Sequence, residues 1–361
     1  MKTVKKIFRW LSIGLGVVLL IFTTLVLIPE PEKVSPISPR PSTQYWDMAA
    51  DFRIAYTHLE ATQSQEGTLI FLHGGPGGYV HSSMIQTLEA LTPLGYEVYL
   101  YDQRGSGLSD RMPRYSDVSF EKHLQDLHEI IHTQIGAKQV VLMGQSFGSV
   151  IAAHYSARYP EDVAKLIFSS PGRLLPYRTI DGQYANLDSL YPTPDSLRFI
   201  EPYNFVKDVN RTSLKPKAIV ATMGALILDR KLVSDRQMDR MLNTLATKFT
   251  KGMVCDPAKV LPEEGGGGLY AYLATNTGDQ PEIRDQLAQI MAPTLVLQGQ
   301  CEYHSYSMAY EYADLYPHGR YQLIEGAGHE IWWEQKEVYI EAIEAFLGQD
   351  LPIDSLGQAI E

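Results

Sequence analysis

The sequence predicts an α/β fold in which helices cover both faces of a mostly parallel sheet. Short apolar runs alternate with helix-length stretches, which is the pattern of strands joined by crossover helices. The chain has 361 residues, 45% hydrophobic and 20% charged, a composition typical of a globular protein with a substantial core. This length fits one large unit with an insertion as well as two domains, so the order of motifs must decide.

Six short apolar segments are expected to form buried parallel strands, because each is bounded by Gly, Pro or charged residues. They are Thr68–Leu72, Glu97–Tyr101, Gln139–Met143, Lys165–Phe168, Thr294–Gln298 and Tyr321–Ile324. The intervening stretches have the length of helices, and one of them, Phe120–Ile135, repeats apolar residues at spacings of three and four. Such a helix packs its apolar side on the sheet.

The alternation stops after Gly172 and resumes near Asp285. We interpret the polar and helical stretch between them as a cap inserted into the α/β core. The predicted division is a core of residues 44–171 and 286–348, a cap of residues 172–285 and a C-terminal tail of residues 349–361. Within the cap, the four consecutive glycines Gly265–Gly268 would weaken a packed helix or strand, so a mobile loop is expected there.

The N-terminal segment has the features of a transmembrane signal anchor. Trp10–Ile28 is an uncharged run of 19 residues, long enough as a helix to span the roughly 30 Å hydrocarbon core of a bilayer. Residues 1–9 are a basic tail, which predicts a cytoplasmic N-terminus and an extracytoplasmic body, periplasmic or at the cell exterior. The proline-rich residues 29–43 are expected to form a stiff linker.

The alternative to an anchor is a cleaved signal peptide. The apolar run exceeds the usual core of about 7 to 15 residues, and Thr23–Ile28 offers no small-x-small cleavage site. We therefore favour an uncleaved single-pass anchor.

Charge and cysteine content exclude several classes of function. The formal net charge is −11, and all 42 acidic residues follow the apolar run, so the body would repel nucleic acid. Cys255 and Cys301 lack the clustered spacing of a zinc or iron–sulfur site, and no metal or cofactor is implied. In an oxidising compartment they could form a disulfide, which would pin the loop next to Glu302.

The most informative motif is G-x-S-x-G at Gly144–Gly148, directly after a predicted strand and before a helical stretch. The glycines allow a sharp turn that exposes Ser146 above the sheet edge, where the helix N-terminus favours developing negative charge. Ser146 could instead be a helix N-cap, but the strand, turn and helix context favours a nucleophile.

A nucleophilic serine needs a base and an acid, and in this architecture the chain order is Ser, acid, His. His329 is the predicted base, because it lies downstream of Ser146 in the loop after the last predicted strand, at the C-terminal sheet edge. Glu302 is the predicted acid, because it is the one carboxylate in the loop after Thr294–Gln298. Asp285 and Asp314 are the alternative acids.

An oxyanion hole requires backbone N–H groups aimed at the developing alkoxide. We expect one from Phe147, which follows the nucleophile, and one from Gly75 in the glycine-rich loop His73–Gly78. His73 is expected to fix this loop rather than act as a base. The loop lacks the Lys and Ser/Thr of a P-loop and the spacing of a dinucleotide site.

These motifs follow one another in a recognisable order. They are His73–Gly78 (HGGPGG), Asp102–Ser109 (DQRGSGLS), Gly144–Gly148, Gly299–Glu302 and Gly326–His329. In this order the chain resembles the α/β-hydrolase superfamily, specifically its proline iminopeptidase-like branch, over about residues 50–348. The resemblance implies an eight-stranded sheet with a helical cap, and a serine exopeptidase that removes an N-terminal residue, often proline, from short peptides.

The resemblance also implies that acidic residues of the cap hold the free amine of the substrate. By their position in the cap, Glu263 and Glu264 are the expected substrate-binding residues, with Glu201 a weaker candidate. The role of these residues is a prediction from the family alone.

The chain departs from the family pattern within the site. Glu302 stands where Asp is usual, and Gln145 precedes the nucleophile where Gly is common. The membrane anchor is also unusual in this branch. The DQRGSGLS segment is expected to brace the floor of the site through a pairing of Asp102 with Arg104.

Three functions remain open from the sequence. The first is an aminopeptidase acting through Ser146 and His329 on short peptides, with a cap acid binding the amine. The second is a carboxylesterase or lactonase that applies the same triad to small neutral esters. The third is a non-catalytic, membrane-tethered binding module, which the complete set of catalytic parts disfavours.

Overall fold

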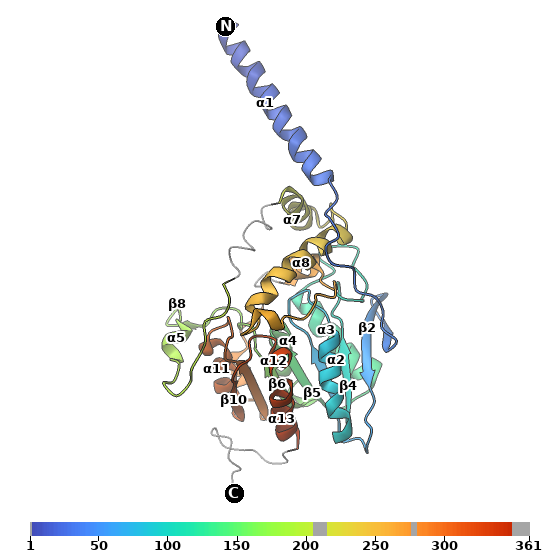
Figure 1. Cartoon of the computed structure of the whole chain (residues 1–361), viewed down its shortest axis with the longest axis vertical. Coiled ribbons are helices and arrows are strands. Elements are labelled where there is room, and N and C mark those ends of the chain that lie inside the picture. Colours follow the sequence, from blue (N-terminus) through green and yellow to red (C-terminus); the bar gives the residue numbers. More distant parts are fainter. Residues whose placement is uncertain (1, 205–214, 276–279, 349–361) are drawn as a thin grey trace.

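Eight strands form one sheet in the order β1-β2-β4-β3-β5-β6-β9-β10 (Figure 1). The structure is a computed structural model that describes residues 2–204, 215–275 and 280–348. The neighbouring strands from β4 to β10 run parallel, whereas β1 pairs antiparallel with β2, and β2 with β4. The prediction of a mostly parallel, eight-stranded sheet is confirmed.

All six predicted strands are present, with bounds that differ by at most two residues. The strands are β1 (Thr43–Met48), β2 (Phe52–Leu59), β3 (Gly67–Leu72), β4 (Tyr96–Tyr101), β5 (Val140–Gln145), β6 (Val163–Ser169), β9 (Thr294–Gly299) and β10 (Gly319–Ile324). The edge hairpin β1–β2 was not predicted, because its strands mix buried and exposed residues and contain no continuous apolar run.

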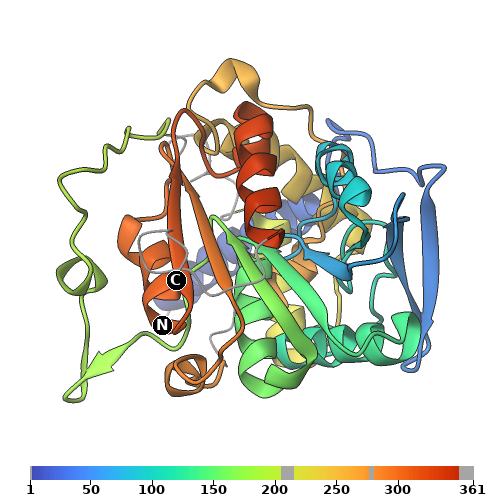
Figure 2. The same cartoon turned by 90° about the horizontal axis from the view of Figure 1, so that it is seen from below.

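Helices cover both faces of the sheet, with α2 and α13 on one face and α3 and α4 on the other (Figure 2). The core helices are α2 (Ser82–Leu88), α3 (Phe120–Glu129), α4 (Phe147–Arg158), α11 (Tyr306–Leu315), α12 (Ile331–Glu334) and α13 (Lys336–Leu347), with the helical turns η1 (Glu89–Leu94), η2 (Ile130–Ile135) and η3 (Pro160–Asp162). The predicted helix Phe120–Ile135 is α3 continued by the π-helical turn η2.

Successive residues of one strand enter two different cores. In β3, Ile70 and Leu72 pack with α3 and α4, whereas Leu69 and Phe71 pack with α2 and α13. This follows from the two-residue period of a strand, which sends alternate side chains to opposite faces. A sheet that is apolar on both faces explains why the central strands are continuous apolar runs.

The segment between β6 and β9 is the insertion that the sequence predicts as a cap. Its elements are β7 (Thr179–Ile180), β8 (Gln183–Tyr184), α5 (Leu187–Leu190), α7 (Pro216–Leu228), α8 (Asp235–Phe249), η4 (Thr250–Gly252), η5 (Pro257–Lys259), α9 (Leu269–Thr275) and α10 (Arg284–Leu287). Helix α8 lies above the body of the sheet (Figure 1), and its Met238 and Met241 pack with residues of α7 and α9 in a separate small core.

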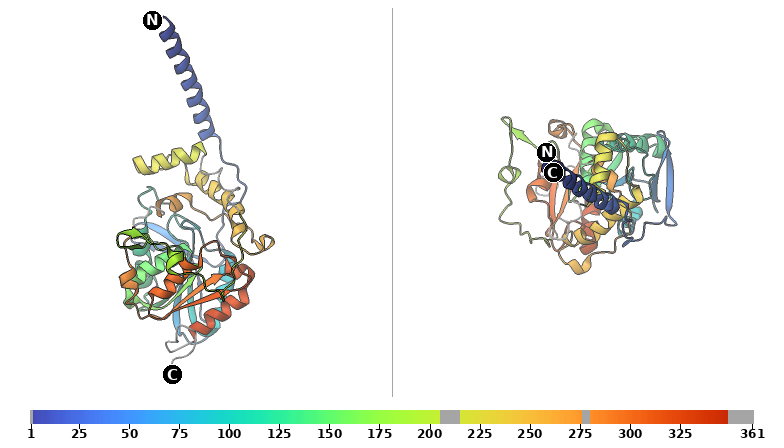
Figure 3. Two further views of the ribbon diagram at one scale, coloured as in Figure 1. Left: turned by 90° about the vertical axis from the view of Figure 1, so that its left-hand side faces the viewer. Right: turned by 90° about the horizontal axis from the view of Figure 1, so that it is seen from above.

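The N-terminal residues form helix α1 (Lys2–Leu27), which projects from the body near α7 (Figure 3). Among the described residues, no helix combines the length and the hydropathy that a membrane span requires. The transmembrane anchor predicted at Trp10–Ile28 is therefore not supported by the structure.

The proline-rich segment after α1 lies against the cap rather than standing free as a spacer. Glu30 pairs with Lys215 at 2.7 Å, and Glu32 pairs with Arg240 of α8. Ile37 donates its backbone N–H to the carbonyl of Gly265. This segment thus covers part of the cap surface.

The DQRGSGLS segment braces the fold, but not through the predicted pairing of Asp102 with Arg104. The Asp102 carboxylate accepts the backbone N–H groups of Val80 and Leu108, each at 2.7 Å. Arg104 pairs instead with Asp126 of α3, and both side chains are only 5% exposed. Spacing along the chain suggested a local pair, whereas the fold places the partner on a helix.

Replacing Asp126 with Asn is expected to lower the free energy of unfolding by about 3 kcal/mol or more, because Arg104 would keep a buried charge without its partner. Urea denaturation would measure this. The matched control is Glu121→Gln, which breaks the exposed pair with Arg158 and should cost about 1 kcal/mol or less. Equal costs for the two variants would contradict the prediction.

Candidate active site

Ser146 lies at a sharp turn between β5 and α4. Its φ of 52° and ψ of −116° are strained for a residue with a side chain, and this conformation raises the hydroxyl above the sheet edge. The turn requires glycine on both sides. A Cβ on Gly144 would lie 2.5 Å from the carbonyl carbon of Gly148, and one on Gly148 would collide with the carbonyl of Leu72.

Glu302 and His329 form a fully buried pair at the ends of β9 and β10. Nδ1 of His329 lies 2.9 Å from both carboxylate oxygens of Glu302, and the two side chains are 0% and 1% exposed. The backbone N–H of His304 donates to the same carboxylate at 3.0 Å. The predicted acid and base are thus in direct contact.

The pair also changes the protonation of its members. Burial alone would lower the pKa of His329, but the Glu302 carboxylate outweighs burial and raises that pKa. Burial opposes the charge on Glu302, yet its contacts with His329 and His304 lower the pKa of Glu302 to about 2. An ionised Glu302 keeps the His329 proton on Nδ1 and leaves Nε2 as a proton acceptor.

Ser146 and His329 line the same cavity, and both contact the hydroxyl of Tyr303. This hydroxyl donates to Nε2 of His329 at 3.5 Å and also hydrogen-bonds to Ser146. Burial raises the pKa of Tyr303 well above its ordinary value, so the hydroxyl stays protonated. Tyr303 was not identified as a site residue from the sequence. Its position directly after Glu302 was the signal that could have identified it.

The two predicted oxyanion-hole residues belong to segments next to the nucleophile: Phe147 follows Ser146 directly, and Gly75 belongs to the glycine-rich loop. The N–H of Phe147 lies in the first turn of α4, where a helix has no acceptor of its own. The glycine-rich loop lies against Ser146, because a Cβ on Gly74 would be 2.9 Å from the Cβ of Ser146. Gly75 follows with a φ of +130°, which a side chain would strain.

His73 fixes this loop, as the sequence suggested. Its Nδ1–H donates to the carbonyl of Gly74 at 2.8 Å, and its Nε2 accepts the N–H of Gln103 at 2.9 Å. Burial lowers the pKa of His73 to about 4, so it stays neutral. With both ring nitrogens engaged, His73 holds the loop to the DQRGSGLS segment.

The structure separates the acids that were predicted to bind substrate. Glu263 lines the cavity and accepts a hydrogen bond from Tyr79 at 2.7 Å. Glu264 points away and pairs with Arg40 at 2.6 Å. Glu201 is exposed and is not among the residues that line the cavity. Of the three, only Glu263 is placed to meet a ligand beside Ser146.

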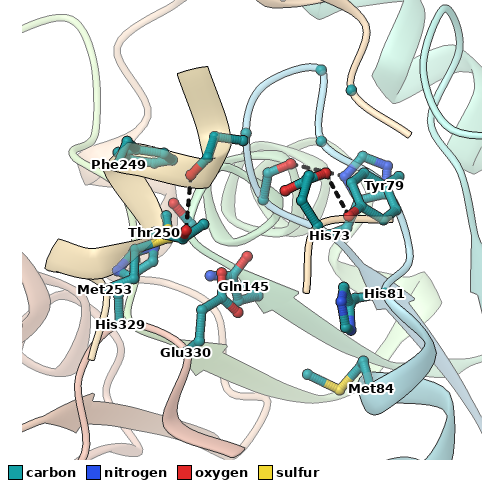
Figure 4. A pocket seen from close by; sticks show the side chains of 18 of the residues that line it. His73, Tyr79, His81, Met84, Gln145, Phe249, Thr250, Met253, His329 and Glu330 are labelled. Carbon is teal, nitrogen blue, oxygen red and sulfur yellow. Dashed lines mark hydrogen bonds between the residues drawn. The ribbon is translucent and has the colours of Figure 1, made fainter. Parts of the chain in front are cut away.

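A further acid, Glu330, lies in the cavity and was missed in the sequence. Figure 4 shows it beside His329 and near Gln145. Burial raises the pKa of Glu330 to about 7, and the neighbouring Glu302 and Glu263 act in the same direction. Its position directly after the base was the signal that could have identified it. No Lys or Arg occurs among the described residues that line this cavity.

The glycine run Gly265–Gly268 is packed, so the predicted mobile loop is wrong. All four residues are buried, and Asn243 of α8 bonds the carbonyl of Gly265 at 3.0 Å and the N–H of Gly267 at 2.9 Å. Gly268 donates to the carbonyl of Gly77 at 2.8 Å. The glycines permit this approach between backbones rather than conferring mobility.

Cys255 of the cap and Cys301 form a disulfide with a Cα–Cα distance of 5.1 Å. Cys301 directly precedes Glu302 and donates its N–H to the carbonyl of Ala327, two residues before His329. The bridge therefore attaches the cap to the loop of the acid.

Two clusters of His and carboxylate side chains among the described residues bring their ligand atoms within 4.8 Å of one another. One contains Glu302 and His329, whose mutual hydrogen bond uses the atoms that a metal would need. In the other, Asp162 accepts hydrogen bonds from His132 at 2.8 Å and from Tyr155 at 2.6 Å. Hydrogen bonding accounts for both clusters.

Comparison with known proteins agrees with this geometry. The profile of the α/β hydrolase fold family matches residues 67–336. A proline iminopeptidase of Saccharolobus solfataricus is 25% identical over 312 residues, covering 81% of this chain and 89% of the relative. The sequence-based resemblance to this family and branch is thereby confirmed.

Solved structures share the fold at low identity. A proline iminopeptidase of Mycobacterium smegmatis superposes with a TM-score of 0.53 at 19% identity, covering 85% of this chain and 97% of the other. An esterase of Exiguobacterium antarcticum gives 0.54 at 18% identity, covering 85% and 99%. Neighbours with different activities show the fold alone.

Reaction of Ser146 with a fluorophosphonate tests the pair without a peptide substrate. Glu302→Gln is expected to slow the reaction by about three orders of magnitude, because the imidazole loses its charged partner. The wild-type rate should fall as pH drops through a His329 pKa above the ordinary 6.5, since only neutral imidazole accepts the serine proton.

The control is Glu325→Gln, an exposed residue four positions before His329 that should react as wild type does. A rate independent of pH between about 5 and 9, or an unchanged rate in Glu302→Gln, would contradict the assignment.

Proposed function

This chain belongs to the α/β hydrolase fold family and is a hydrolase, and from that premise we propose that it is a serine aminopeptidase. In this proposal, Ser146, Glu302 and His329 act as a catalytic triad. The enzyme releases an N-terminal residue, proline or another small or apolar residue, from short peptides.

One observation carries the choice of a free-amine substrate: the cavity beside Ser146 is acidic. Glu263 and Glu330 line it, and the described lining residues include no cationic Lys or Arg to neutralise them. The pKa values of both carboxyls are raised, first by burial. A bound ammonium group would stabilise their ionised forms, so the cavity is complementary to the N-terminal amine of a peptide.

The proposed reaction proceeds through an acyl-enzyme. Oγ of Ser146 attacks the first peptide carbonyl while Nε2 of His329 takes the serine proton, and the N–H groups of Gly75 and Phe147 stabilise the oxyanion. His329 then gives the proton to the nitrogen of the leaving peptide. Water attacks the ester next, its proton passes to His329, and Ser146 leaves with that proton as the free residue departs.

An esterase acting on neutral substrates is the second candidate. It is favoured by the apolar part of the cavity, where Phe71, Met84 and Trp332 are among the lining residues. These side chains also suit the side chain of a proline or an aliphatic residue. The acidic groups therefore favour the aminopeptidase. Whether turnover requires a free amine on the substrate distinguishes the two candidates.

We also propose that the domain works in an oxidising compartment outside the cytoplasm. The support is the disulfide between Cys255 and Cys301, since structural disulfides persist mainly in such compartments. Fractionation of the source cells, with the thiol state of both cysteines measured, would test it. A reduced pair in the native protein would contradict this location.

The full-length protein is expected to hydrolyse proline and alanine anilides with a free amine and to leave their amine-blocked forms intact. Ser146→Ala should abolish turnover, because no other group replaces the nucleophile. The assay is release of the aniline, with a nitrophenyl ester as the third substrate. Ester turnover that is indifferent to an amine would instead establish the esterase.

Replacing Glu330 with Gln is expected to raise KM for the free-amine anilide about ten-fold or more, since a hydrogen bond to a charged group is worth about 1.5–3 kcal/mol. Turnover of an ester that lacks an amine should change little. The control is Glu264→Gln, because Glu264 pairs with Arg40 outside the cavity. Equal effects on both substrates would remove Glu330 from amine binding.

A further inference from the structure

A short segment of the cap, Met253–Asp256, is attached to both loops that carry the predicted acid and base. We call this segment the strap. Val254 at its centre is fully buried, and Met253 lines the cavity beside Ser146. The strap lies so close to the base loop that a Cβ on Gly328 would be 2.6 Å from the Cα of Val254.

Glu334 of α12 joins the strap to the base loop. Its Oε2 accepts the backbone N–H groups of Cys255 at 2.8 Å and Gly328 at 2.9 Å, and its Oε1 accepts that of Asp256 at 3.0 Å. Gly328 is the residue before His329. One carboxylate thus holds three donors from two segments that are more than 70 residues apart in the chain.

Two further contacts connect the strap to the chain next to His329 and next to Glu302. Glu330, directly after His329, donates its N–H to the carbonyl of Met253 at 3.2 Å. Cys255 is bonded through its sulfur to Cys301, next to Glu302. The strap therefore contacts the chain immediately before and after His329 and immediately before Glu302.

We propose that Glu334 is a positioning residue of the triad: it holds the strap against the loop of His329, so that the imidazole keeps its contact with Glu302 in the cavity that Ser146 also lines. This inference rests on the proposed serine mechanism. Charge matters because a carboxylate accepts all three N–H groups, whereas the amide of Gln turns a donor towards at least one of them.

The test is Glu334→Gln in the full-length protein, with Glu337→Gln as the control, since Glu337 is exposed on α13. For each, the rate of Ser146 modification by a fluorophosphonate is measured against pH, together with kcat and KM for a free-amine anilide. Glu334→Gln should lower the modification rate and kcat about ten- to a hundred-fold, with KM within about two-fold, because small displacements of catalytic groups are costly.

The pH profile separates positioning from a general loss of stability. Glu302 and, less strongly, Glu330 raise the pKa of His329. Loosening of the His329–Glu302 contact should therefore lower this pKa and move the acidic limb of the modification rate to lower pH. A loss of folded protein would lower the modification rate by the same factor at every pH and would leave the acidic limb at the same pH. If Glu334→Gln is too unstable to assay, Glu334→Asp keeps the charge but is too short to hold both segments, and the same loss of kcat is expected.

The outcomes distinguish this inference from the proposed function. Wild-type rates and an unmoved pH limb in either Glu334 variant would overturn the positioning role and leave the serine mechanism intact. A wild-type protein whose Ser146 is not modified would overturn the serine mechanism, and the positioning role with it.

Discussion

The buried contact between Glu302 and His329 is the interaction on which the rest of the site depends. Two ionisable groups without exposure are stable only as a paired, hydrogen-bonded unit, because an unpaired charge there would cost several kcal/mol. The acid and base come from loops after different strands, so both loops must be held in register. Three kinds of contact hold these loops. The hydrogen bond from Cys301 to Ala327 joins the two loops directly, whereas the disulfide and the Glu334 contacts attach them to the strap.

Close approach between glycine backbones is the second organising feature. The cap meets the core where Gly268 lies against Gly77 and Gly105, at distances that leave no room for a Cβ. Hydrogen bonds from Gly107 to Gly266 and from Gly268 to Gly77 join the same segments. These backbone contacts therefore fix the cap against the glycine-rich loop His73–Gly78. The glycine composition that suggests mobility in an isolated loop produces packing in this context.

The sequence predicted the features that depend on local pattern. Continuous apolar runs identified six strands, and the G-x-S-x-G turn identified Ser146, because both leave signals within a few residues. Contacts between residues far apart in the chain left no such local signal in the sequence. Asp126 was missed as the partner of Arg104 because the contact forms only when α3 packs, and Glu330 was missed because its carboxyl becomes part of a cavity only when the cap is in place. The order of strands restricted the predicted acid to one loop, and the structure places Glu302 of that loop in contact with His329.

Three glutamates lie around one serine, and their surroundings divide the roles. Glu302 contacts the imidazole and a backbone N–H, which lower its pKa to about 2 and keep it charged. Glu330 lies beside the same imidazole, but burial dominates and raises its pKa to about 7. Glu263 is likewise shifted upward by burial, against a hydrogen bond from Tyr79. A permanently ionised carboxylate suits the orientation of a base, whereas carboxyls that gain charge when a cation approaches suit the binding of an amine. The same residue type can therefore serve both halves of the proposed reaction, because partners and burial, rather than the side chain itself, determine the charge.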